Sequence, residues 1–209
     1  MASHQTTARP KTDSRLRRIG LYGGTFDPLH IAHLIIAQYI KDRLKLDRVI
    51  FLPSSAPPHK EVFCSPELRL QMVQAGIRGN AAFSCSDLEL RRAGVSYSVD
   101  TASQMASEFA LSRDNLFWIM GADNFIELQK WKDPERLLEL CTVAVFPRQG
   151  YPFSDAYPPF QQKAIYIHEA PLIEISSTRI RTLIQEGHSI RYWVPDAVAE
   201  LIRHHAIYS

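Results

Sequence analysis

The chain has 209 residues, of which 45% are hydrophobic and 22% are charged, and its formal net charge is +2. This length suits one large domain, and the composition is that of a globular protein that builds its own core. It excludes a membrane helix, because no segment approaches the roughly 18 consecutive apolar residues that a span requires, so we expect no membrane partner.

The positive charge is concentrated at the start of the chain. Residues 1–18 hold five lysines or arginines and one aspartate, a net +4, so the remaining residues sum to −2. A nearly neutral body is unlike a nucleic-acid-binding surface, and we expect no nucleic-acid partner. We predict that residues 1–17 form a disordered basic tail and that residues 18–209 form a single domain. The start lacks the apolar run of a secretory signal.

Three cysteines, Cys64, Cys85 and Cys141, are widely spaced and include no Cys-x-x-Cys pair. This pattern argues against both a disulfide framework and a zinc site, and it suits a reducing cytoplasm. We therefore predict a cytoplasmic protein with no metal ligands of its own. The sequence leaves open whether the chain forms a homo-oligomer.

The first half of the chain alternates short apolar runs with segments of helical periodicity. In chain order we predict a strand at 18–22, a helix that begins near Pro28 and is most regular at 33–44, and a strand at 48–52. A helix follows at 65–77, where Ser65 and Pro66 form a helix start, and then a strand at 83–90. The next helix is predicted at 98–109.

The second half continues the alternation. A continuous apolar run at 116–120 predicts a strand covered on both faces. We then predict a helix at 133–140, a strand at 142–146, an irregular excursion at 150–162 and a strand at 164–168. Helices at 176–186 and 195–205 complete the chain; Gly187 is suited to end the first of them.

This order of elements predicts an α/β fold. We expect a Rossmann-like, doubly wound parallel sheet with helices on both faces and a small C-terminal helical extension. Ligands of such sheets bind beyond the carboxyl ends of the strands. The informative residues should therefore follow residues 22, 52, 120 and 168.

The first strand runs into the segment GGTFDPLHIAH at 23–33. Gly23 and Gly24 would let backbone N–H groups approach a phosphate, and the following helix would direct its positive end at the same space. His30 and His33 are three residues apart, which places both rings on one side of a helical turn. Two imidazoles there form a donor cluster for a polyphosphate, whereas a zinc site would need a third ligand that the spacing does not supply.

This segment resembles the GTFDPxHxGH signature of the HxGH nucleotidyltransferase superfamily, in which the first strand, glycines and histidines occupy the same places. The resemblance implies that ATP contacts Gly23, Gly24, Thr25, Phe26, His30 and His33. One departure is Ala32, which stands where the family has glycine close to the nucleotide. The extra methyl group predicts weaker ATP binding and does not imply loss of function.

A second segment, ISSTRIR at 175–181, follows the last predicted strand. Serines at a helix start commonly cap the helix, but Arg181 can also reach back over the N-terminus towards a phosphate. The segment is similar to the superfamily's ISSTxIR motif. That resemblance implies that Ser177, Thr178 and Arg181 contact the triphosphate and that backbone near Ile175 borders the adenine.

Further segments resemble the bacterial nicotinate-nucleotide adenylyltransferases. PPHK at 57–60 implies that Lys60 lies near phosphate. GAD at 121–123 implies that Gly121 admits a ribose and that Asp123 accepts hydrogen bonds from the ribose hydroxyls. Trp131 would lie against the pyridine ring, main-chain amides near it would meet the ring's carboxylate, and the Ser98 hydroxyl would approach the nicotinate. Considered alone, Trp131 also suits a core position and Ser98 a helix cap. The resemblance continues through the C-terminal segment 193–208.

The resemblance implies transfer of AMP from ATP to nicotinate mononucleotide, with His30, His33, Lys60 and Arg181 as the catalytic residues. Mg²⁺ would be carried by the ATP phosphates. Nicotinamide mononucleotide and phosphopantetheine are alternative acceptors, and PPHK and GAD disfavour the second. A glycerol-phosphate cytidylyltransferase lacks support, since ISSTRIR replaces its usual motif. An aminoacyl-tRNA synthetase would need a KMSKS loop. A non-catalytic nucleotide sensor stays open.

Overall fold

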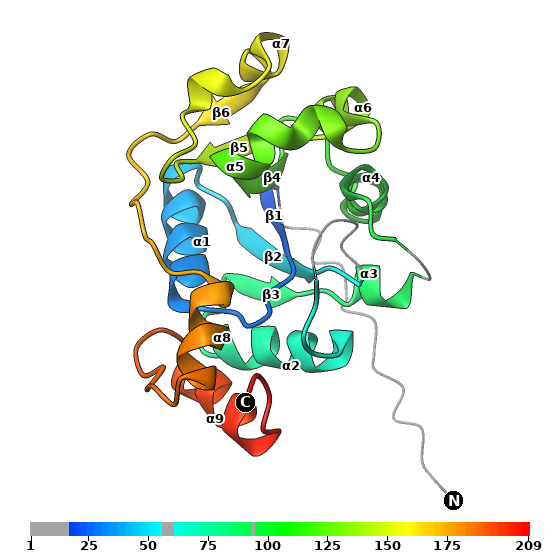
Figure 1. Ribbon diagram of the computed structural model, residues 1–209. Helices are drawn as coiled ribbons and strands as arrows, with labels where there is room; N and C mark the ends of the chain where they lie inside the picture. The colour runs from blue at the N-terminus through cyan, green and yellow to red at the C-terminus, as the bar shows by residue number, and fades with distance from the viewer. Residues whose placement is uncertain (1–16, 56–60, 93–94) are drawn as a thin grey trace, which may run out of the picture.

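A computed structural model describes residues 17–55, 61–92 and 95–209. Their strands form one parallel sheet of six strands in the order β3-β2-β1-β4-β5-β6, which Figure 1 shows crossing the molecule. The strands are β1 (Ile19–Gly24), β2 (Arg48–Pro53), β3 (Phe83–Cys85), β4 (Leu116–Gly121), β5 (Thr142–Phe146) and β6 (Ala164–Tyr166). The predicted doubly wound α/β class is confirmed.

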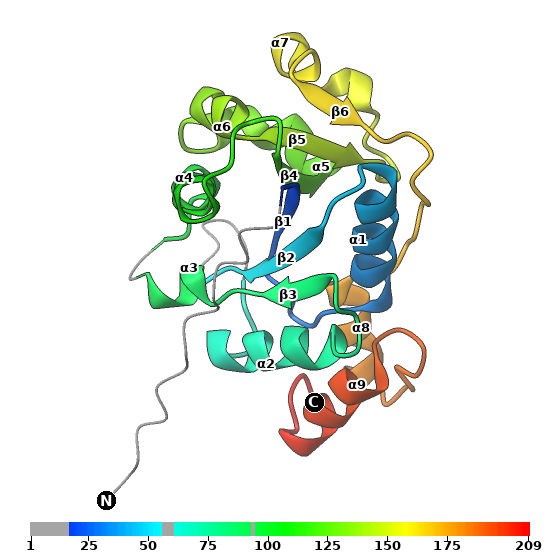
Figure 2. The same cartoon turned by 180° about the vertical axis from the view of Figure 1, so that it is seen from behind.

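Helices cover both faces of the sheet because the central strands are apolar on both sides. On one face, Leu21 and Trp118 pack with α4 (Ser98–Phe109), α5 (Ala122–Ile126) and α6 (Pro134–Leu140). On the other face, Phe51 and Ile119 pack with α1 (Ile31–Arg43). Figures 1 and 2 show α1 on one side of the sheet and α4 and α6 on the opposite side. Successive residues of a strand thus face different cores.

A third cluster of buried residues joins the C-terminal helices to α2 (Pro66–Gly76). Helices α8 (Ser177–Gln185) and α9 (Asp196–His204) pack on α2 through Met72, Ile180 and Val198. The last buried residue of the chain, Tyr208, belongs to the same cluster. The small helical extension predicted from the sequence therefore rests on α2, next to the loop that follows β1 (Figure 1).

Several predicted bounds are wrong. The strand predicted at 83–90 ends at Cys85, because the Ser86 hydroxyl accepts a hydrogen bond from the backbone of Leu88 and Asp87 becomes the N-cap of α3 (Leu88–Arg91). The excursion predicted at 150–162 contains two short helices, η2 (Phe153–Asp155) and α7 (Pro158–Gln161). A further short helix, η1, spans Glu127–Lys130.

The predicted tail lies outside the described residues except for Arg17. Within the described segments, every helix is too short or too polar to cross a bilayer.

Candidate active site

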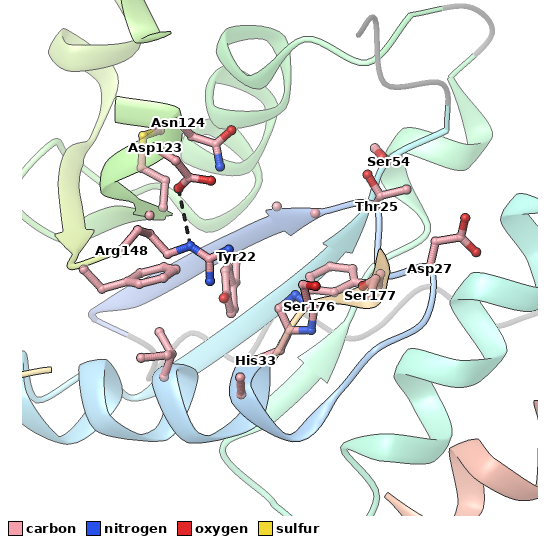
Figure 3. A pocket seen from close by; sticks show the side chains of 18 of the residues that line it. Tyr22, Thr25, Asp27, His33, Ser54, Asp123, Asn124, Arg148, Ser176 and Ser177 are labelled. Atoms are coloured by element: carbon pink, nitrogen blue, oxygen red, sulfur yellow. Dashed lines mark ion pairs between the residues drawn. The ribbon is translucent and has the colours of Figure 1, made fainter. Parts of the chain in front are cut away.

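A cleft of about 940 Å³ opens at the carboxyl ends of β1, β4 and β5. The chain passes from β1 outwards to β2 and β3, and then returns to place β4 on the other side of β1. The cleft therefore lies at the point where the strand order reverses, where doubly wound sheets bind ligands. Figure 3 shows side chains from both halves of the sheet facing this space.

The loop after β1 places the two predicted histidines together at the cleft. His30 is the N-cap of α1, so the helix begins at Ile31 and the start predicted near Pro28 is wrong. The rings of His30 and His33 are stacked, with centroids 3.6 Å apart and an interplanar angle of 19°. The backbone N–H of His30 donates to Nδ1 of His33 at 3.2 Å. In its neutral form His33 then carries its ring proton on Nε2.

Gly24, the last residue of β1, makes room for an aromatic ring. A Cβ on Gly24 would lie 2.9 Å from the ring of Phe26, and Phe26 itself has a left-handed φ of 50°. The Phe26 ring contacts that of His33, with centroids 5.0 Å apart. Glycine at 24 is thus required for packing within the protein, in addition to the phosphate approach predicted from the sequence.

His30 is held in its neutral form. Its side chain is 4% exposed, and burial together with the positive charge of Arg148 lowers the pKa of His30 to about 3. Its Nδ1 atom is buried without a hydrogen-bond partner among the described residues. A buried polar atom at the edge of a cleft is suited to a ligand that completes its hydrogen bonding.

Because His30 is neutral in the folded protein, we predict how the free energy of unfolding depends on pH. The imidazole of the unfolded chain takes up a proton below its ordinary pKa of 6.5, whereas the folded protein does not until about pH 3. The unfolded state therefore binds more protons in this window, and stability is lost as the pH falls through it. Between about pH 4 and 6, the free energy of unfolding of the parent should fall more steeply than that of His30→Asn, by up to about 1.4 kcal/mol per pH unit.

Urea unfolding at several pH values measures the two slopes. Asparagine suits the N-cap position, so the comparison removes the titrating group and keeps a polar cap. The raised pKa of the buried Glu89 acts in the opposite direction, but it is present in both proteins and cancels in the difference. Parallel slopes for the parent and His30→Asn would contradict a neutral buried His30.

Helix α8 brings the second predicted motif to the same loop. Ser176 is the N-cap of α8 and accepts from the backbone of Arg179, so Ser176 performs the capping role. The Ser177 hydroxyl donates to the carbonyl of Pro28 at 2.9 Å. Ser176, Ser177 and Thr178 all line the cleft, and Figure 3 shows Ser176 and Ser177 beside His33. Ile175 is outside the cleft lining and packs against the C-terminal cluster.

Arg181 joins α8 to both neighbouring loops. Its Nη1 donates to the carbonyl of Asp27 at 2.9 Å, and its guanidinium lies 4.1 Å from the centroid of the Phe63 ring. Its Nη2 donates to the Thr178 hydroxyl at 3.3 Å. The guanidinium is therefore fixed at the cleft by a carbonyl, a hydroxyl and an aromatic face, which orient its remaining N–H groups.

A second end of the cleft lies beside α4 and η1. Ser98 and Trp131 line it, together with Lys130 and Lys132. Tyr97 is the N-cap of α4, so Ser98 is the first helical residue and does not supply the cap. Trp131 packs against the core with one side and borders the cleft with the other. Lys132 lies 4.5 Å from the centroid of the Tyr97 ring and 3.1 Å from a carboxylate oxygen of Asp100.

Arg148 lines the cleft although sequence reasoning missed it. It follows β5, and its Nε lies 3.8 Å from Oδ1 of Asp123 (Figure 3). Oδ1 of Asp123 is buried without a hydrogen-bond partner among the described residues. A Cβ on Gly121 would lie 2.9 Å from Cγ of Arg148, so this glycine makes room for the pair. The signal was available, because residues after any strand of such a sheet belong to its ligand edge.

The structure brings the predicted site residues of the described segments to one cleft, with the exception of Ile175. The cleft lining includes Gly23, Gly24, Thr25, Phe26, His30, His33, Ser98, Gly121, Asp123, Trp131, Ser177, Thr178 and Arg181. Ala32, the departure from the superfamily glycine, is 5% exposed and also lines it. Lys60 lies outside the described residues.

Comparison with known proteins gives the class and then the family. A family model described as cytidylyltransferase-like matches residues 21–183, so the chain is a nucleotidyltransferase by class. Two relatives named probable nicotinate-nucleotide adenylyltransferase, from Thermus thermophilus and a Geobacter species, are 41% and 38% identical over 191 and 213 residues. Both alignments cover 91% of this chain and at least 98% of the relative. The chain belongs to the nicotinate-nucleotide adenylyltransferase family.

A solved structure supports the fold. Nicotinic acid mononucleotide adenylyltransferase from Plasmodium falciparum, complexed with NaAD, superposes with a TM-score of 0.77 and 16% sequence identity. The match covers 92% of this chain and 97% of that one.

Proposed function

We propose that the protein transfers the AMP part of ATP to nicotinate mononucleotide and so forms deamido-NAD and pyrophosphate, a step of NAD synthesis. The observation that carries the proposal is the convergence of His30, His33 and Arg181 on one cleft at the carboxyl end of β1. These three residues come from two segments nearly 150 residues apart. Membership of the adenylyltransferase family supports the reaction.

The triphosphate is assigned to the end of the cleft between the β1 loop and α8. There the imidazoles of His30 and His33, the hydroxyls of Ser177 and Thr178 and the guanidinium of Arg181 supply donors for phosphate oxygens. The adenosine is assigned to Gly121, Asp123 and the residues near Ile175. Arg148 adds a positive charge beside His30. Oδ1 of Asp123, which forms an ion pair with Arg148 but no hydrogen bond among the described residues, provides an acceptor for a ribose hydroxyl.

The mononucleotide is assigned to the other end of the cleft. Trp131 would lie against the pyridine ring, main-chain amides near it would meet the ring's carboxylate, and the Ser98 hydroxyl would approach the nicotinate. Lys60 and Asp123 would contact the phosphate and ribose. Lys130 and Lys132 line this end, and each forms an ion pair with an acidic side chain, Glu127 and Asp100 respectively. The preference for nicotinate over nicotinamide mononucleotide therefore rests on the relatives that are named for nicotinate.

The chemistry is one in-line displacement at phosphorus. An oxygen of the mononucleotide's 5′-phosphate forms a bond to the α-phosphorus of ATP as the bond to the bridging oxygen breaks, and pyrophosphate leaves with the electron pair. The attacking phosphate is ionised at neutral pH, so no side-chain base is required. Catalysis then consists of positioning the reactants and neutralising charge on the leaving group.

Mg²⁺ is assigned to the ATP phosphates. Among the described residues, no three histidine, cysteine, aspartate or glutamate side chains gather as they would around a metal ion. The donors at the triphosphate end are imidazoles, hydroxyls and a guanidinium, which bind phosphate oxygens and leave the ion to phosphate and water. When bound, the ion would neutralise part of the triphosphate charge.

Pyrophosphate release tests the proposal. The protein, ATP and Mg²⁺ should release pyrophosphate with nicotinate mononucleotide. The value of kcat/KM for the acid should exceed that for the amide by about tenfold or more, because a site that pairs with the carboxylate has polar groups left unpaired when the amide binds. Equal values would contradict the assigned ring end. Binding of ATP without pyrophosphate release with either mononucleotide would establish the non-catalytic sensor instead.

A further inference from the structure

The carboxylate of Asp27 is buried and fully occupied within the protein. Asp27 is 2% exposed, and its Oδ1 accepts from the Tyr208 hydroxyl at 2.6 Å and from the Cys64 thiol at 3.0 Å. Its Oδ2 accepts from the backbone N–H of Phe63 at 2.7 Å. In Figure 3 this carboxylate points away from His33. Asp27 therefore binds other parts of the chain and leaves the phosphate contacts to its neighbours.

Asp27 connects three segments that border the cleft. It lies in the loop between β1 and His30, and its backbone carbonyl holds Arg181 of α8. Through Phe63 and Cys64 its carboxylate holds the end of the loop that follows β2. Through Tyr208 it holds the last residues of the chain. A shift of Asp27 would consequently move donors from both predicted motifs.

Tyr208 is buried and contacts two side chains of other segments. It is the last residue but one, yet it is 8% exposed, and its hydroxyl lies 3.3 Å from Sγ of Cys64. Burial and the hydrogen bond to Asp27 raise the pKa of Tyr208, so its hydroxyl stays protonated and donates at every working pH. Removing such a donor costs more free energy at a buried carboxylate than at an exposed one, because water does not replace the lost hydrogen bond.

Arg69 holds the opposite side of the same loops. It is fully buried, and its guanidinium donates to the carbonyls of Thr25 at 2.8 Å and Ser55 at 3.1 Å. The β1 loop is thus held from α2 by its backbone and from the C-terminus by the Asp27 side chain. The contact with Tyr208 is one of three that the Asp27 carboxylate accepts, together with those from Phe63 and Cys64.

We propose that Tyr208 is a positioning residue, whose hydrogen bond to Asp27 locks the chain's C-terminal end onto the β1 loop and sets the arrangement of the phosphate-binding donors. This role rests on the proposed function. Tyr208 would then affect the rate of adenylyl transfer by positioning the phosphate-binding donors, without contacting either substrate.

A double-mutant cycle tests the coupling. Tyr208→Phe keeps the ring in the core and removes only the hydroxyl, so kcat should fall about tenfold with each KM within about threefold of the parent. Asp27→Ala removes the acceptor of this hydrogen bond, so kcat should fall as well, and the double variant should be no slower than Asp27→Ala alone, because both changes remove the same contact. Tyr192→Phe is the matched control, since Tyr192 is 77% exposed, and should equal the parent. Assays are run well below each variant's unfolding midpoint.

Alkylation of Cys64 gives a readout that does not depend on activity. Weakening the contact by one hydrogen bond should raise the rate of Cys64 modification by iodoacetamide about fivefold in Tyr208→Phe, as the terminus opens more often. Peptide mass mapping follows Cys64, with Cys85 as an internal reference. Multiplicative losses of kcat, or an unchanged Cys64 rate, would overturn the inference. An inactive parent would instead refute the proposed function, and the Cys64 rate would still decide the contact.

Discussion

Replacement of His33 by alanine is expected to lower kcat by about 10²-fold or more, the effect of removing a preorganised donor to developing negative charge. His33 is fixed before substrate binds, because its ring stacks on His30 and its Nδ1 accepts from the His30 backbone. That hydrogen bond places the ring proton on Nε2, so the ring is prepared to donate. A fixed donor stabilises the leaving group without reorganisation during the reaction.

The measurement is the steady-state rate of pyrophosphate release, with the unfolding midpoint as a check on folding. His168→Ala is the matched control, since His168 follows β6 but is exposed and lies outside the cleft lining. Turnover of His33→Ala within a few-fold of the parent would refute the assigned role. An equal fall in kcat for His33→Ala and His168→Ala would also refute that role.

Replacement of Arg181 by alanine is expected to lower kcat/KM for ATP by about 10²-fold to 10³-fold. The substitution removes a positive charge from the triphosphate end and also the donor that holds the Asp27 carbonyl. Arg181→Lys should recover little of the kcat/KM lost in Arg181→Ala. An ammonium group cannot contact a carbonyl, a hydroxyl and an aromatic ring together as the guanidinium does.

Arg179→Ala provides a close control for this charge. Arg179 lies two residues earlier on α8, and its exposed side chain is 3.9 Å from Glu186, so its loss should leave kcat/KM near that of the parent. Initial-rate kinetics at varied ATP separates the two arginines. Equal losses in both variants would indicate a general effect of positive charge, and full rescue by Arg181→Lys would contradict the assigned geometry.

Local patterns predicted much of the site. Continuous apolar runs predicted the buried strands correctly, because a parallel strand covered on both faces is apolar throughout. The spacing of His30 and His33 predicted their shared side. Ser86 and Asp87 were misread as strand residues, since turn and cap formation by short polar side chains overrode the apolar pattern around them.

The sequence by itself determined the alternation of strands and helices, the glycine turn and the two motifs, because each depends on residues that are close in the chain. Only the tertiary structure decided which distant groups meet. Arg148 beside Asp123, the neutral His30 and the contact of Tyr208 with Asp27 all arise from burial and from contacts between separate elements. Burial and long-range proximity are properties of the packed chain, so no local pattern encodes them.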